Sequence, residues 1–500
     1  ARPRAGIANP KPYRGPMPRL PRPILLLTVL GLCLRLALLL CAGEMELERD
    51  EAHYLSSALR WNHFGFYSDQ FRFMWPPGYA FLLSLLLDAF GARALFIARL
   101  LGVLASASIG LTSMLFARRI FSERAAWVAG LLWCLHLPLA EYTTSLLTET
   151  LFIAVFLPTL YLLFDAATRL ANSSDSNPSS EPAPSLSGRL LLAGLLFGLS
   201  LYLRDVALFL APILALALAA AARGRPLLAR CAPASLFLLA TAATVLPWTL
   251  RNYEVYGRLV PIGSTLGENV YRGLNARYSN SDLMDLEAIR SAHGLTPLSA
   301  VQRPWTNALA TDREDHWARA IRPYNTIDRL GANVELGKQF ALARPSWFLR
   351  SRLQTLADFF APVSYFVRHA AVGRYNGPLG EPLLEGLLVP WATATTLLII
   401  FCGILGLCTG LIGRPQWWIV GGTIAYFTAT ALLISHSRFR LPIEPLLIVL
   451  AAGLLTGSWR RATRGRRALA LAASMVLMFF WWLNAPLSYS IIAMAMEHTP

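Results

Sequence analysis

The chain has 500 residues, of which 55% are hydrophobic and only 15% are charged, and 45 Lys and Arg against 29 Asp and Glu give a formal net charge of +16. This composition excludes a disordered chain and disfavours a water-soluble enzyme, because the charges lie between apolar runs of about 20 residues. The basic residues flank these runs, so their placement indicates contact with membrane lipids and no nucleic acid partner.

The chain begins with a basic, proline-rich segment, residues 1–23, which contains no acidic residue. A positive segment before an apolar run is retained in the cytoplasm, and the run that follows it crosses the membrane outward. We therefore expect a disordered cytoplasmic tail and an uncleaved first helix over 24–43.

Eleven apolar runs follow one another along the chain and predict about eleven transmembrane helices. They cover residues 24–43, 93–117, 125–142, 146–164, 190–203, 206–222, 232–250, 386–411, 417–435, 445–458 and 468–487. When the helices alternate from a cytoplasmic N-terminus, the arginine-rich turns all fall on the cytoplasmic side. This pattern predicts an all-α, multi-pass protein of the inner (plasma) membrane.

The same pattern divides the chain into expected parts. These are a cytoplasmic tail (1–23), an N-terminal transmembrane module (24–250) with an outer loop at 44–92, an extracytoplasmic segment (251–385), C-terminal transmembrane helices (386–487) and a tail (488–500). The mixed composition of 251–385 predicts a small extracytoplasmic subdomain of helices and irregular loops.

An acidic segment follows the first apolar run and ends in Asp50–Tyr54. On a helix, Asp50, His53 and Tyr54 stand at positions i, i+3 and i+4, so a carboxylate, an imidazole and a phenol share one face. Such a face can supply a general base and hydrogen-bond donors. The alternative is a solvated juxtamembrane helix whose acids only follow the charge bias between the two sides of a membrane.

Aromatic residues and the pair Pro76–Pro77 follow this helix. The prolines fix the entry of an amphipathic run, 80–91, which is too short to span comfortably. We expect it to lie along the membrane interface, as does the helix that carries Asp50.

Charged residues also occur inside or at the ends of the later apolar runs. Glu149 begins one of them, and an acid there is either functional or favoured by the helix dipole. Arg204 interrupts another, either as half of an ion pair with Asp205 or as a ligand for a lipid phosphate. The remaining outer cations are Arg251, Arg438 and Arg440, which either hold an anion or extend to lipid headgroups.

In chain order, these segments resemble the GT-C fold glycosyltransferases that use polyprenyl-phosphate sugars, the bacterial relatives of protein O-mannosyltransferases and aminoarabinose transferases. Six motifs carry the resemblance: Asp50–Tyr54 (DEAHY), Pro76–Tyr79 (PPGY), Ala117–Phe121 (ARRIF), Thr148–Phe152 (TETLF), Pro247–Asn252 (PWTLRN) and Arg438–Pro442 (RFRLP).

The resemblance implies a hexosyl or pentosyl transferase of the cell envelope that works on the extracytoplasmic face. Asp50, with Glu51 beside it, would be the catalytic base, and the reaction would invert the anomeric carbon. The donor would be a polyprenyl-phosphate sugar and the acceptor a protein, a glycan or another lipid. Its phosphate and sugar would be bound by His53, Tyr54, Glu149, Arg204, Arg251, Arg438 and Arg440.

Two departures from the aminoarabinose transferases restrict what carries over. Met74 and Trp75 stand where that subgroup has an acidic and a basic residue, and His53 stands where it has arginine. The resemblance therefore implies the general family and not that subgroup. A divalent metal on Asp50, Glu51 and Glu149 is left open, since three scattered carboxylates fit such a site only loosely.

Two other functions compete with the transferase. A transporter or lipid flippase would also place charges inside the membrane, although it should show broken helices at corresponding positions of two halves. A non-catalytic membrane subunit would use 251–385 to bind a partner and would tolerate neutral substitutions in the acidic loop.

Overall fold

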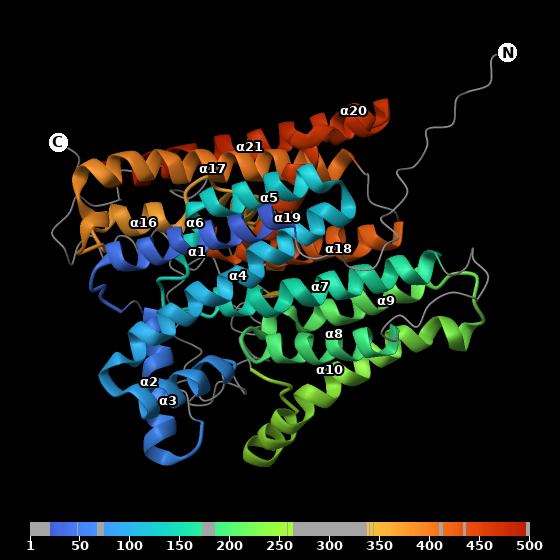
Figure 1. Cartoon of the computed structure of the whole chain (residues 1–500), viewed down its shortest axis with the longest axis horizontal. Helices are drawn as coiled ribbons and strands as arrows, with labels where there is room; N and C mark the ends of the chain where they lie inside the picture. The colour runs from blue at the N-terminus through green and yellow to red at the C-terminus, as the bar shows by residue number, and fades with distance from the viewer. Residues whose placement is uncertain are drawn as a thin grey trace.

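The computed structural model describes residues 21–47, 49–67, 75–172, 186–257, 259–263, 338–339, 341–343, 345–409, 414–433 and 437–496. All regular secondary structure in these ranges is helical. The long helices run roughly side by side, while α2 and α3 lie together at the left-hand end of the molecule in Figure 1.

The N-terminal half contains the helices α1 (Arg22–Ala42), α2 (Arg49–Phe64), α3 (Gly78–Phe90), η1 (Gly91–Arg93), α4 (Ala94–Ile120), α5 (Glu123–Leu135), α6 (Leu137–Glu141), α7 (Glu149–Asn172), α8 (Leu186–Leu201), η2 (Asp205–Leu210), α9 (Ala211–Ala221) and α10 (Leu227–Tyr256). The C-terminal half contains α15 (Pro345–Phe359), α16 (Tyr365–Ala371), η5 (Pro378–Gly380), α17 (Pro382–Thr409), α18 (Arg414–Thr430), η6 (Ser437–Ile443), α19 (Glu444–Gly453), η7 (Leu454–Ser458), α20 (Trp459–Arg461) and α21 (Arg464–Met496).

The described residues of each of the eleven apolar runs lie mostly on helix, although not every helix has the length of a full span. Within the described ranges, seven helical units are long and apolar enough to cross a membrane, and α8 and the η2–α9 unit are shorter apolar helices. The chain is therefore an all-α, multi-pass membrane protein. The number of eleven crossings stays a prediction for the shorter helices.

Helices α3 and α4 form one apolar unit, Gly78–Ile120, of 43 residues. At about 1.5 Å per residue this unit exceeds the bilayer core, which needs only about 20 residues. Gly91, with a positive φ of 55°, ends α3 and separates it from α4. The break leaves α4 as the span, and the interfacial position of α3 stays a prediction.

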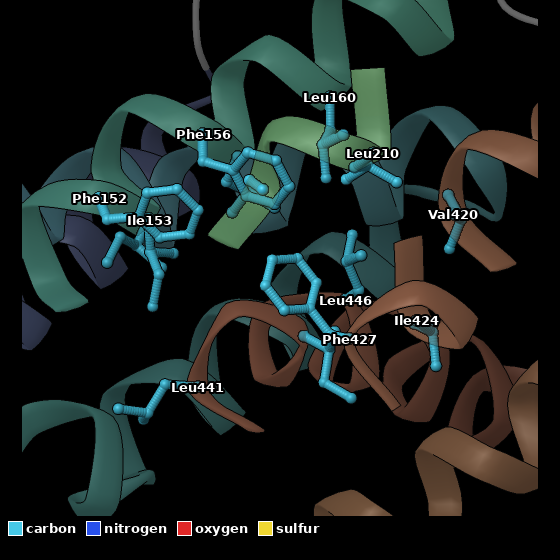
Figure 2. Close-up of a cluster of buried hydrophobic side chains, with 14 of the residues drawn as sticks. Phe152, Ile153, Phe156, Leu160, Leu210, Val420, Ile424, Phe427, Leu441 and Leu446 are labelled. Atoms are coloured by element: carbon cyan, nitrogen blue, oxygen red, sulfur yellow. The ribbon is translucent and has the colours of Figure 1, made fainter. Parts of the chain in front are cut away.

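The centre of the bundle is built on α7 and α19. Phe152, Phe156 and Leu160 project from α7 toward α18, where the Phe427 ring lies 5.9 Å from that of Phe156 (Figure 2). All ten residues of α19 are buried. A helix that is covered on all sides has to be apolar all round, and α19 meets this condition except for its first residue, Glu444.

A close approach of two backbones joins α1 to the C-terminal half. Gly43 ends α1 with a positive φ of 75°, and a Cβ at this position would lie 2.5 Å from the backbone nitrogen of Gly377. The Gly377 amide donates to the carbonyl of Ala42 at 3.2 Å. Only glycine permits this contact, which fixes the chain just before the acidic segment begins.

The expected parts of the chain are only partly within the described ranges. Residues 1–20 of the tail and most of 251–385 lie outside them, as do residues 497–500. The described part of 251–385 includes α15 and α16, which pack against α21. The division into parts stays a prediction.

Candidate functional site

Helix α2 carries the acidic motif in the segment between α1 and α3. Asp50 and Glu51 lie in its first turn, where the helix dipole favours negative charge. Tyr54, one turn later, is buried with its ring edge-on to Trp75 at 5.4 Å and to Tyr79 at 5.1 Å. This packing at the start of α3 fixes α2 and hence the position of Asp50.

Four charged side chains from separate segments meet beside Asp50, and we call Asp50, Glu149, Arg204 and Arg438 the carboxylate–arginine cluster. The Arg438 guanidinium donates to Asp50 Oδ2, and its Nε lies 3.7 Å from Glu149 Oε1. Arg204 Nη1 donates to the same Glu149 oxygen at 2.5 Å and to Thr148 Oγ1 at 3.3 Å. Two acids and two arginines thus alternate in space.

The members of this cluster differ in how much of each is exposed. The Asp50 side chain is 21% exposed, whereas Glu149 is 2% exposed. Arg438 and Arg204 are 15% and 16% exposed. Asp50 is therefore the carboxylate of the cluster that a molecule in solvent or lipid can reach.

Several buried polar atoms near the cluster have no hydrogen-bond partner among the described residues. They are Glu149 Oε2, Tyr142 Oη and Ser437 Oγ. The Tyr142 ring stacks on Tyr365, with centroids 5.1 Å apart. Buried polar atoms without partners are uncommon, and beside a partly exposed carboxylate they are candidates for contact with a ligand.

Glu51 belongs to a second group of polar side chains, which we call the Glu51 anchor. The anchor consists of Glu51, Arg374, His369 and Glu141. Glu51 is fully buried, and it accepts from the Leu146 amide at 2.6 Å and from Arg374 Nη2 at 2.5 Å. Arg374 also lies 2.8 Å from His369 Nε2, and His369 Nδ1 lies 2.7 Å from Glu141 Oε1. The anchor joins α2 to the turn that leads into Thr148 and Glu149.

The sequence reasoning did not find Arg374 and His369. Both lie in the 251–385 segment, whose residues were assigned only to an outer subdomain. A usable signal was present, because Arg374 and His369, together with Arg368, occur in a short stretch, Tyr365–Tyr375, whose other residues are aromatic, aliphatic or glycine. Buried charges of this kind require a partner, but the sequence does not say which acid supplies it.

Arg440 lies outside the carboxylate–arginine cluster. Its side chain is 1% exposed and donates to Glu444 Oε1 at 3.0 Å and to the carbonyls of Phe359 and Ala361 at 2.6 and 2.9 Å. Glu444 is also 2.9 Å from His136 Nε2. These contacts join η6 to α15 and, through Glu444, to His136 between α5 and α6, and they occupy Nε and Nη1 of Arg440.

Arg251 also lies apart from the cluster, at the end of α10. Its Nη2 donates to the carbonyl of Tyr67 at 2.9 Å, and its guanidinium lies 4.8 Å from the ring centroid of Trp248. In the same motif, Asn252 donates to the carbonyls of Val260 and Ile262. The PWTLRN motif thus holds two loops together.

The remaining predicted residues lie on α2. His53 is half-buried, and Tyr54 is buried close to the cluster. Burial, together with the nearby carboxylates of Glu149 and Asp50, raises the pKa of the Tyr54 phenol. Tyr54 is therefore a neutral phenol at physiological pH and can donate a hydrogen bond.

The three carboxylates suggested for a metal do not form one set of ligands. Glu51 is turned to Arg374, while Asp50 and Glu149 lie on two sides of the Arg438 guanidinium. A guanidinium thus takes the position that a shared cation would need, and the described residues contain no group of three or more acidic, histidine or cysteine side chains that could hold a metal ion. The residues do not fit a shared metal site, and no step below uses one.

Comparison with solved structures identifies proteins of similar fold. The oligosaccharyltransferase of Archaeoglobus fulgidus, solved with a tethered acceptor peptide that contains the NVT sequon, matches 95% of this chain and 56% of its own, at 13% identity and a TM-score of 0.50. This chain has the GT-C fold. The result confirms the fold that the ordered motifs predicted.

A second match to this GT-C chain is ArnT from Cupriavidus metallidurans, solved with undecaprenyl phosphate. The two chains are 15% identical, the match covers 95% of this chain and 75% of ArnT, and the TM-score is 0.45. No protein-family model and no curated protein sequence matches the chain. The GT-C chain spans little more than half the length of the oligosaccharyltransferase that it matches.

Proposed function

We propose that this chain is an integral membrane glycosyltransferase that moves a sugar from a polyprenyl-phosphate donor to an acceptor hydroxyl on the extracytoplasmic face of the inner membrane. The fold shared with an oligosaccharyltransferase supports glycosyl transfer. The observation that carries the proposal is the pairing of a reachable carboxylate, Asp50, with the guanidinium of Arg438 beside Arg204.

In this proposal Asp50 is the general base. Its carboxylate takes the proton from the acceptor hydroxyl as the hydroxyl oxygen forms a bond to the anomeric carbon of the donor sugar. The bond from that carbon to the phosphate oxygen breaks, and the polyprenyl phosphate leaves from the opposite face. The configuration at the anomeric carbon inverts, as in other single displacements at a sugar.

Arg204 and Arg438 serve the leaving group. As the bond breaks, negative charge grows on the phosphate, and guanidinium groups bind phosphate through paired hydrogen bonds. Arg438 contacts Asp50 before substrate binds, so a phosphate that draws Arg438 toward itself frees the carboxylate to act as a base. Donor binding and base activation are thereby coupled through one side chain.

The other predicted residues divide between substrate contact and support. Glu149 holds both arginines, and its unpartnered Oε2 can accept from a sugar hydroxyl. His53 and Tyr54 complete the α2 face that meets the donor. We assign Arg251 and Arg440 to the framework, since protein carbonyls and Glu444 already bind them.

Glu51 takes a supporting role in this proposal. Because it is buried and bound to Arg374, it holds Asp50 in place and does not exchange a proton with the acceptor. The acceptor class, whether protein, glycan or lipid, and the type of sugar, whether hexose or pentose, are questions for the assay.

The test is transfer from a panel of radiolabelled polyprenyl-phosphate sugars by the purified chain in proteoliposomes. Asp50→Asn should lower transfer by about 10²- to 10⁴-fold, the usual contribution of a general base. Glu46→Gln is the matched control, because Glu46 is an exposed acid of the same loop and should retain activity.

The outcomes distinguish a glycosyltransferase from a flippase and test the role of Asp50. Consumption of one donor by the wild type and by Glu46→Gln, but not by folded Asp50→Asn, supports the transferase. Undiminished transfer by Asp50→Asn would exclude Asp50 as the base. Folded wild type that consumes no donor but moves a fluorescent lipid phosphate across the bilayer would favour the flippase.

A further inference from the structure

A third charged group lies toward the opposite end of α7 from Glu149, where α7 ends and α8 begins. We call Asp165, Arg119, Arg169 and Arg189 the Asp165 arginine cluster. Arg169 Nε and Arg189 Nη1 each lie 2.8 Å from Asp165 Oδ2, and Arg119 Nη2 lies 3.6 Å from Oδ1. It includes an arginine of the ARRIF motif, which the proposed reaction does not use.

The charges of this cluster do not balance among the described residues. Three guanidiniums share one carboxylate, and the neighbouring Arg118 is paired with Glu123 at 2.7 Å. Counting only the described residues, two positive charges are thus left without a carboxylate at the edge of an apolar bundle. Uncompensated charge in such a place is costly unless an anion shares it.

The cations are also partly withdrawn from water. The side chains of Arg189 and Arg119 are only 14% and 18% exposed, and Arg189 Nε is buried with no hydrogen-bond partner in the described part of the chain. Gln416 of α18 donates to Thr168 on the adjoining turn of α7 at 3.2 Å. The charged residues of the site therefore come from three helices, α4, α7 and α8, with α18 packed beside them, and Arg189 Nε has no partner among the described residues.

An apolar surface adjoins these cations on α8. Leu191, Leu192 and Leu195 are 42%, 47% and 45% exposed, and they begin two residues after Arg189 on the same helix. An arginine donor at a helix end with exposed leucines along the next turns is suited to a lipid, whose phosphate meets the cation and whose acyl chain covers the leucines.

We propose that the Asp165 arginine cluster binds the phosphate of an anionic lipid in the leaflet at this end of the bundle, the end that the sequence predicts to be cytoplasmic. The phosphate binds at the exposed edges of the Arg189 and Arg119 guanidiniums, of which that of Arg119 lies furthest from Asp165. The exposed leucines of α8 favour a lipid over free inorganic phosphate, which offers the same anion without an acyl chain.

The test is native mass spectrometry of the purified full-length chain titrated with phosphatidylglycerol, with phosphatidylcholine, or with inorganic phosphate. Arg119→Gln/Arg189→Gln should bind phosphatidylglycerol about tenfold more weakly or worse, because it removes the two guanidiniums that contact the lipid phosphate in this proposal, and each such arginine favours an anionic lipid by several-fold. Arg460→Gln/Arg461→Gln removes the same charge from two exposed arginines outside the cluster and should bind like the wild type.

A second variant, at Asp165, tests the same site if Arg119→Gln/Arg189→Gln does not fold. Asp165→Asn removes the competing carboxylate and should tighten phosphatidylglycerol binding, a result that a purely structural ion pair would not give. Equal binding by the cluster variant and the wild type, or equal loss in the control variant, would overturn the site. Saturation by inorganic phosphate with no preference for the lipid would overturn the lipid as occupant.

Discussion

At the residue scale, the protein separates two acidic neighbours by giving each a different partner. Asp50 is partly exposed and meets Arg438, whereas Glu51 is buried and meets Arg374. Successive residues on a helix point in directions about 100° apart, so a pair of acids can face two different groups. One carboxylate is thereby partly exposed, as the proposed general base has to be, while the other holds the helix.

Arg374→Gln is expected to destabilise the protein by about 3–5 kcal/mol, because it leaves the buried Glu51 carboxylate without its cation. Glu51→Gln/Arg374→Gln should be less destabilised than the sum of the two single variants. Denaturant unfolding in detergent micelles measures both values. The exposed Arg460→Gln is the control, and additive single effects would show that the two side chains do not interact.

The raised pKa of Tyr54 predicts a loss of stability at high pH. In the unfolded chain the phenol ionises near its ordinary pKa of 10.0, whereas in the folded protein burial and the nearby acids hold the proton to higher pH. The stabilisation is complete below about pH 10 and is lost as pH rises toward the folded pKa. Tyr54→Phe should make this decline in the unfolding midpoint shallower, and the exposed Tyr489→Phe should not.

The sequence indicated the chemistry of the site better than its contacts. Asp50, Glu149, Arg204 and Arg438 were found because charges inside or beside apolar runs are conspicuous, and the structure brings these four together. Arg374 was missed because it lies 323 positions from Glu51, and no local pattern joins residues so far apart. For the same reason Arg440 and Arg251 were grouped with the cluster on their type alone.

At the scale of elements, short connections position the cluster. The Gly78 amide, at the start of α3, donates to the carbonyl of Tyr202 at 2.9 Å, two residues before Arg204. The PPGY motif therefore fixes the turn that carries Arg204, and does more than begin an amphipathic helix. The PPGY motif can be recognised in the sequence, but the sequence does not show that Gly78 contacts Tyr202.

Gly78→Ala is expected to lower transfer by up to about 10²-fold, since small misplacements of a binding group are that costly. A Cβ at this position would lie 2.7 Å from the Tyr202 carbonyl oxygen, so the turn and Arg204 have to move. Gly465→Ala is the control, because no atom lies within 4 Å of its new Cβ. Wild-type rates for Gly78→Ala would show that this joint does not set the position of Arg204.

At the scale of the whole molecule, hydropathy locates the apolar helices but does not give the number of membrane crossings. The described residues of all eleven apolar runs lie mostly on helices, yet helices such as α5, α8 and α18 have 13, 16 and 17 residues, near or below the length of a span. Their neighbours bury much of their surface, so length alone does not decide whether they cross. The side of the membrane on which each loop lies is then predicted from the positive charges that flank the helices.

The topology predicted from the positive charges can be tested by labelling. With the N-terminus inside, the turn that bears Arg460 and Arg461 faces the cytoplasm, and the loop before α17 faces outward with the candidate site. In a cysteine-free background, a membrane-impermeant maleimide should label Glu381→Cys in intact cells and Thr463→Cys only after permeabilisation. Both positions are exposed, so the fold does not hide either thiol. The reverse pattern would place Asp50 on the cytoplasmic side and would require a donor presented from the inner leaflet.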